Sequence, residues 1–137
     1  MLIALLVAYF AVHGGTTTGS PLLGDPGKLQ SAIEHQVKDP ARLAQLKALV
    51  GDVKAADKEA RSQQEAAAKA VEEVAARQAT PPAQLEAAVD TLEAGQRARR
   101  DKQVSLRLRL AALTTPAEWT AIQAEVFPAR APVPAAR

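Results

Sequence analysis

A run of six basic residues between positions 97 and 109 is the densest set of chemically capable side chains, and only one acid, Asp101, lies within it. Bases at helical spacing can bind phosphates of lipids or nucleic acids, or pair with carboxylates of a neighbouring helix. No aromatic residue interleaves these bases, so single-stranded nucleic acid would find no stacking platform. Ion pairing with acids of residues 40–79 is the favoured interpretation. The candidate partner contacts are Trp119, Arg97, Arg99, Arg100, Lys102, Arg107 and Arg109.

Catalytic and metal-binding patterns do not emerge from the rest of the chain. His13 and His35 have no second histidine at ligand spacing, and Glu34, adjacent to His35, would face another way on a helix. The absence of cysteine removes thiolate chemistry and disulfides. No Ser-His-Asp set, phosphate-binding glycine loop or carboxylate pair can be argued. We expect a protein that is not an enzyme and has no cofactor or metal.

The composition indicates how these residues are positioned. Aromatic residues are 3% of the 137 residues, and none lies between Lys28 and Thr115. A large buried apolar side chain contributes roughly 1.5–3 kcal/mol, so the middle of the chain has only Leu, Val and Ala to pack along a narrow seam. The net charge of +2 is too small to imply nucleic acid. We therefore expect an all-α, elongated protein.

Four Asp-Pro or Thr-Pro pairs predict where helices begin, because the first residue can cap a helix whose first position proline tolerates. Thr115 to Glu118 also fits a capping box. The expected helices are residues 26–38, 40–79, 81–113 and 116–126. The pairs are Asp25-Pro26, Asp39-Pro40, Thr80-Pro81 and Thr115-Pro116.

The two long segments predict an antiparallel, coiled-coil-like hairpin, because apolar positions alternate by three and four in both. A turn at residues 80–82 places Gln64 near Gln96 and Arg97, and brings the polar positions of the two seams into one layer. The first seam is Leu43, Leu46, Val50, Val53, Asp57, Ala60, Gln64, Ala67, Val71, Val74 and Gln78. The second is Leu85, Val89, Leu92, Gln96, Arg99, Gln103, Leu106, Leu110 and Leu113.

Two short apolar stripes are expected to cover the open end of the hairpin, away from the turn. The first short helix offers Leu29, Ile33 and Val37 at a spacing of four. The last helix offers Trp119, Ile122 and Val126. The seam that remains uncovered favours a protein partner or a homodimer.

The N-terminal apolar segment has three open interpretations: an uncleaved anchor, a cleaved export signal, or an arm that packs on a partner subunit. Its eleven residues from Leu2 to Val12 are continuously apolar, but as a helix they would rise about 16 Å, short of the ~30 Å hydrocarbon layer. The first interpretation is favoured. The expected membrane segment comprises Leu2, Ile3, Leu5, Leu6, Val7, Tyr9 and Phe10.

The segment Thr114-Thr115-Pro116-Ala117-Glu118-Trp119 resembles the Leu-Thr-Pro-Glu-Gln signature of the Spy/CpxP-like periplasmic proteins, with Thr115 and Pro116 in the Thr-Pro positions. The layout of the chain is also similar to that of small uncharacterised bacterial envelope proteins. The resemblance implies an exported all-helical hairpin that dimerises and binds unfolded clients or senses envelope stress.

These observations predict four regions: an anchor or signal-like segment at 1–14, a linker at 15–25, a helical hairpin domain at 26–127 and a Pro/Ala-rich tail at 128–137. The expected function is that of a membrane-associated envelope protein acting through protein contacts, accessory or chaperone-like. Its helical domain would be extracytoplasmic, or periplasmic after cleavage. A structural coiled-coil subunit of a membrane complex is the alternative, and a basic helix for anionic lipid or nucleic acid is a more remote one.

Overall fold

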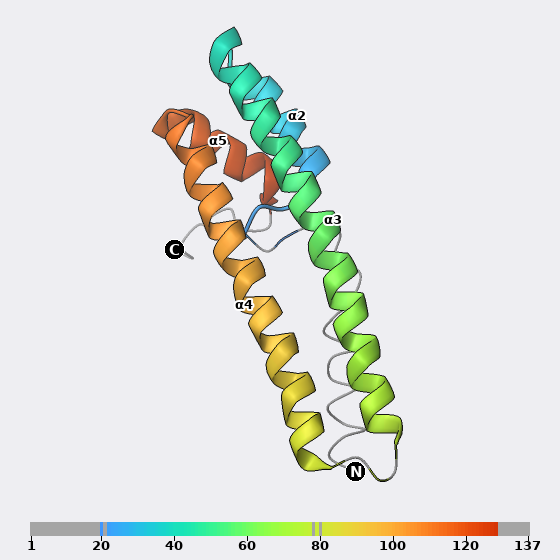
Figure 1. The fold of residues 1–137 in the computed structure, drawn as a ribbon. Helices are drawn as coiled ribbons and strands as arrows, with labels where there is room; N and C mark the ends of the chain where they lie inside the picture. The colour runs from blue at the N-terminus through green and yellow to red at the C-terminus, as the bar shows by residue number, and fades with distance from the viewer. Residues whose placement is uncertain (1–19, 21, 78, 80, 129–137) are drawn as a thin grey trace, which may run out of the picture. The chain divides into compact units, whose positions relative to one another are not determined.

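The computed structural model describes residues 20, 22–77, 79 and 81–128, and these are all-α with no strand. The helices are α2 (Pro26–Gln36), α3 (Pro40–Ala76), α4 (Pro82–Ala112) and α5 (Pro116–Val126), as Figure 1 shows. The chain divides into two units. The core unit comprises Thr18–Asp57 and Lys102–Arg137, and the middle unit contains Lys58–Asp101.

Side-chain caps fix the starts of three helices, as the sequence predicts. Asp25 Oδ1 accepts a hydrogen bond from the Lys28 amide at 3.0 Å, and Asp39 Oδ1 accepts one from the Ala41 amide at 2.9 Å. Thr115 and Glu118 form the complete capping box of α5. Each cap satisfies an amide that has no partner within the helix.

The helix ends differ from the predicted ones by a few residues. Helix α2 stops at Gln36 because Val37 is extended, which points its side chain into the core. Helix α4 begins at Pro82 instead of Pro81, since a residue that precedes a proline is disfavoured in the helical region. Helix α3 ends at Ala76, and the predicted cap Thr80 lies outside the described residues.

The core unit holds one apolar cluster to which all four helices contribute. Both predicted short stripes lie in it, with Trp119 partly buried at its edge, and α2 packs against α5 (Figure 1). Leu29, Ile33, Leu46, Leu110 and Ile122 are the largest fully buried side chains together with Val37 and Val50. The cluster also contains Leu23, Ala32, Leu49, Val53, Leu106 and Val126.

A short turn precedes α2, within the segment expected to be a linker. The backbones of Ser20 and Gly24 exchange two hydrogen bonds, at 3.2 and 2.7 Å. Leu23, between them, is buried in the core. Gly24 has a φ of +71°, a left-handed conformation that favours glycine.

The middle unit has no fully buried side chain among its described residues. Its apolar seam positions are only half-buried: Val71, Val74, Leu85, Val89 and Leu92. The Arg99 Nη1 atom donates a hydrogen bond to the Gln64 Oε1 atom at 2.9 Å. The sequence predicts Gln96 and Arg97 near Gln64, whereas the hydrogen-bond partner is Arg99, the next seam residue after Gln96.

Candidate protein-interaction surface

One face of α4 is buried in the core unit, and this burial fixes which side of the helix faces the core. Gln103, Leu106 and Leu110 repeat at three- and four-residue spacing and are all buried. This spacing keeps side chains on one side of a helix. The opposite side of the same helical segment must therefore face away from the core.

Val104 and Leu108 occupy that opposite side, and they are exposed, at 41% and 64%. They are four residues apart and so lie one above the other on the helix. Lys102 and Arg109 are also exposed, and they lie on one flank of this pair, about a quarter to a third of a turn around the helix from Leu108. We define Val104 and Leu108 with these two bases as the α4 surface.

An apolar pair with two bases on one flank has a defined chemical preference. The two side chains can lose water only by contact with another apolar surface. The neighbouring bases favour carboxylates at the edge of that contact and repel other cations. The α4 surface is therefore suited to a protein segment that carries both apolar and acidic side chains.

Arg107 and Trp119, two predicted contact residues, are brought together inside the core unit. The guanidinium carbon of Arg107 lies 5.3 Å from the centroid of the Trp119 ring, within the range of a cation–π interaction. The Arg107 Nη1 atom also donates a hydrogen bond to the Leu22 carbonyl. Arg107 thus joins the turn before α2, α4 and α5, and its contact with another protein stays a prediction.

The other predicted contact bases are divided between the two units. Arg97 pairs with Glu93 of its own helix at 3.6 Å, and Arg100 is exposed. Arg99 is half-buried, and its Nε atom is buried without a hydrogen-bond partner among the described residues. These three belong to the middle unit, whereas Lys102, Arg107 and Arg109 belong to the core unit.

A network around Glu118 ties α5 to the start of α3. Arg42 donates to both carboxylate oxygens of Glu118, at 2.7 and 3.0 Å, and the Thr115 amide donates to Oε2 at 2.8 Å. These bonds, that of Arg42 first, lower the pKa of Glu118 from 4.5 to about 2. The same pairing raises the pKa of Arg42.

Acid should weaken the core unit through Glu118. Because the folded-state pKa lies below the unfolded one, the stabilisation is complete above about pH 4.5 and is lost as the pH falls towards 2. In Glu118→Gln the amide oxygen still completes the capping box, but the charge-assisted bonds of Arg42 are weakened. We expect the Tm of the wild type to fall more steeply than that of the variant between pH 5 and pH 2. Parallel curves in calorimetric scans would contradict this role of Glu118.

Sequence reasoning missed the exposed pair and the Arg42 contact for different reasons. Val104 and Leu108 are apolar residues outside the seam at a spacing of four, and that signal could have found them. Arg42 and Glu118 lie 76 residues apart, and no local pattern relates positions at such a distance. Among the described residues, no group of His, Cys, Asp and Glu could hold a metal ion.

The predicted membrane segment, from Leu2 to Phe10, lies outside the described residues. Within the part of the chain that the structure describes, each helix is too short or too polar to cross a membrane. No protein-family model, curated protein or solved structure matches this chain.

Proposed function

We propose that this chain is a non-enzymatic protein of the cell envelope that acts by binding another protein, with the α4 surface as the binding site. Its N-terminal apolar segment associates it with the membrane. The α4 surface recognises a segment of a partner that carries apolar and acidic side chains. The helical domain is extracytoplasmic in this proposal.

The observation that carries the proposal is the contrast between the two sides of α4. The inner side packs against the core through the buried side chains of Gln103, Leu106 and Leu110. The outer side leaves Val104 and Leu108 in water, and these are the exposed large hydrophobic residues of the described chain. A rigid helix that presents apolar side chains loses little conformational entropy when a partner covers them.

The fold behind this function, in our proposal, is an antiparallel coiled-coil-like hairpin of α3 and α4. Two observations support it, one in each unit. Leu46, Val53 and Leu110 share one buried cluster in the core unit. In the middle unit, Gln64 and Arg99 form a hydrogen bond between the two helices.

A structural subunit of a larger membrane assembly is the second candidate. The Gln64–Arg99 hydrogen bond favours it, because polar pairs within an apolar seam fix the register of helices at some loss of stability. This candidate predicts a stable complex of fixed stoichiometry. The first candidate predicts exchangeable partners.

Site-specific photo-cross-linking in cells tests the binding site. A photoreactive amino acid in place of Leu108 should give a discrete adduct with another protein, because that side chain lies at the centre of the α4 surface. The matched control replaces Thr120, which is exposed on α5 of the same unit. Adducts of equal yield at both positions, or none at Leu108, would contradict the proposal.

Leu108→Asp should weaken partner binding without affecting the fold. An aspartate removes apolar contact area, and its negative charge repels the acidic side chains of the partner. We therefore expect binding to weaken at least about tenfold. Exposed substitutions usually change stability by no more than about 0.5 kcal/mol, so the Tm should stay unchanged. The yield of the adduct formed from position 104 measures the loss. Undiminished cross-linking would remove Leu108 from the site.

Localisation is tested separately, on the full chain. Cells expressing the protein are fractionated, and protease is added to intact spheroplasts. A membrane-bound, protease-sensitive protein supports the anchored and exported arrangement. A soluble protein that is protected from the protease overturns it and leaves the N-terminal segment as a packing arm.

A further inference from the structure

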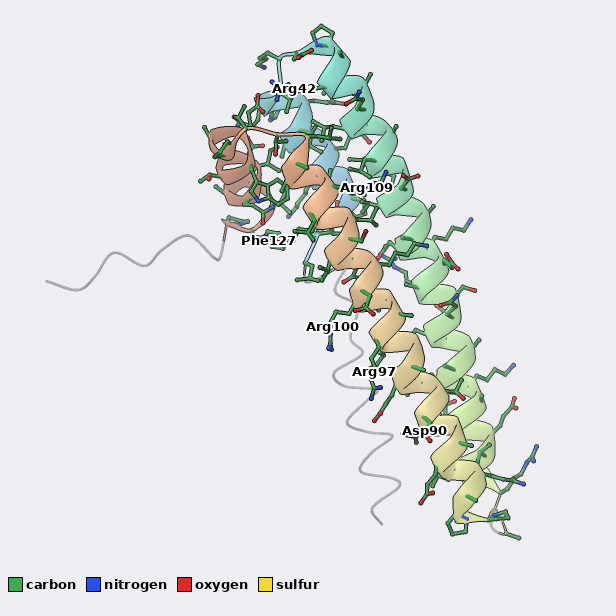
Figure 2. All side chains as sticks on the ribbon, turned by 60° about the vertical axis from the view of Figure 1, so that its left-hand side comes forward. Arg42, Asp90, Arg97, Arg100, Arg109 and Phe127 are labelled. Atoms are coloured by element: carbon green, nitrogen blue, oxygen red, sulfur yellow. The ribbon has the colours of Figure 1, made fainter. Side chains whose placement is uncertain are left out.

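The middle unit carries a second helical stripe that is entirely charged. Its five members, spaced alternately by four and three residues, lie along one side of α4. All are exposed, and Figure 2 shows Asp90, Arg97 and Arg100 spaced along this helix. The stripe comprises Glu86, Asp90, Glu93, Arg97 and Arg100.

The signs of these charges are segregated along the helix. The first three residues of the stripe are acids, and the last two are bases. Suppose that a second α4 helix runs antiparallel and that the twofold axis passes at the level of Gly95. Glu93 then lies opposite Arg97 of the other copy. The same axis places Asp90 opposite Arg100. Both of these pairs therefore join unlike charges, and Glu86, the remaining member of the stripe, lies opposite Val104. A parallel pairing in register would join like charges.

The apolar residues beside the stripe supply a reason to associate. Val89 and Leu92 follow the seam of α4 next to the stripe and are half-buried. The described middle unit contains no fully buried side chain. Two packed helices alone bury too little surface to be independently stable, and a second pair of helices would cover the open side of the seam.

We propose that two copies of this chain associate through the middle units, with the charged stripes of their α4 helices antiparallel around Gly95. In the single chain, Arg97 and Glu93 form an ion pair at 3.6 Å, but their side chains remain 75% and 57% exposed. In the pair of chains, the two residues and their symmetry mates form a ring of four alternating charges. Asp90 and Arg100 extend this ring on both sides.

The association uses other residues than the proposed binding of another protein, although the same axis places Val104 of the α4 surface opposite Glu86 of the second copy. The α4 surface lies within Lys102–Arg137, whereas the stripe lies within Lys58–Asp101. Charge reversal at positions 90 to 100 leaves Val104 and Leu108 unchanged, so cross-linking from Leu108 to another protein measures that binding separately.

Charge reversal tests the arrangement in the full chain, purified in a mild detergent. Sedimentation equilibrium should give a dimer for the wild type. In Arg97→Glu/Arg100→Glu every pair joins two acids, and in Asp90→Arg/Glu93→Arg every pair joins two bases. We expect each double variant to dimerise at least about tenfold more weakly. The substituted side chains are exposed, so circular dichroism should remain unchanged.

Mixing the two double variants provides the decisive measurement. At positions 90, 93, 97 and 100, one chain then presents four acids and the other four bases, so a heterodimer should form. Co-purification through a tag on one chain should recover both. The dimer should weaken as salt rises, since screening acts on exposed charges.

The matched control is Lys58→Glu/Lys69→Glu, which makes the same change in net charge at exposed positions of α3. This control should remain a dimer. A monomeric wild type would overturn the proposal, as would a wild type that associates only with other proteins. It would also be overturned by a dimer that both reversals leave intact, or by a mixture without heterodimers.

Discussion

Gly24→Ala is expected to destabilise the core unit by roughly 2–5 kcal/mol. Gly24 has a φ of +71°, and an L-residue in that left-handed region costs about 1–2 kcal/mol. The added Cβ would also collide with Cγ1 of Val126 and lie 3.3 Å from Cζ of Phe127. Overpacking of this kind typically costs about 1–3 kcal/mol more. Thermal unfolding followed by the fluorescence of Trp119, the single tryptophan, measures the change.

Gly51→Ala is the matched control, because it makes the same chemical change in a different backbone setting. Gly51 lies within α3, and an added Cβ there would meet no atom within 4 Å. Alanine is favoured over glycine inside a helix by about 0.5–1 kcal/mol, so this variant should be slightly more stable than the wild type. Two equal losses of stability would show that the turn around Gly24 has no special role.

Several structural features follow from short-range patterns, and these were predictable. A capping residue followed by proline fixes a helix start through atoms only three residues apart, as at Asp25 and Thr115. The alternation of apolar residues likewise places Leu46 and Val50 on the buried side of α3. Such patterns depend on helix geometry alone, so they need no knowledge of the partner surface.

Features that depend on several segments at once were not predictable in the same way. Leu49 lies outside the two-helix seam but is buried, because α2 and α5 widen the apolar contact beyond what a hairpin requires. The space around Gly24 is limited by Val126 and Phe127, which an added Cβ would meet. Neither relation is visible in the residues around the position concerned.

The candidate surface combines both kinds of information. The sequence alone gives the four-residue spacing of Val104 and Leu108. Their exposure cannot be predicted from it, because it depends on which side of α4 packs against the core. Once Leu106 and Leu110 are buried, the outer side is fixed by geometry. The basic run is evident in the sequence. The contact of Arg107 with the Trp119 ring is not, because it joins two helices.

Leu110→Ala should have the second largest effect, because Leu110 is 0% exposed and belongs to a cluster shared by the turn before α2 and all four helices. Removing a buried leucine side chain beyond Cβ costs about 2–5 kcal/mol, through lost burial and the cavity that remains. For a unit of this size, that loss lowers the Tm by about 10 °C or more. Denaturant unfolding and calorimetry measure the loss directly.

The informative comparison is with Leu108→Ala, which makes the same substitution two residues earlier in α4. Leu108 is 64% exposed, so its truncation should change stability by no more than about 0.5 kcal/mol. The two variants separate the roles of α4, because Leu110→Ala should reduce stability and Leu108→Ala should reduce only partner binding. If Leu108→Ala destabilises the protein as much as Leu110→Ala does, the outer side of α4 is part of the folded core, and the proposed binding site must lie elsewhere.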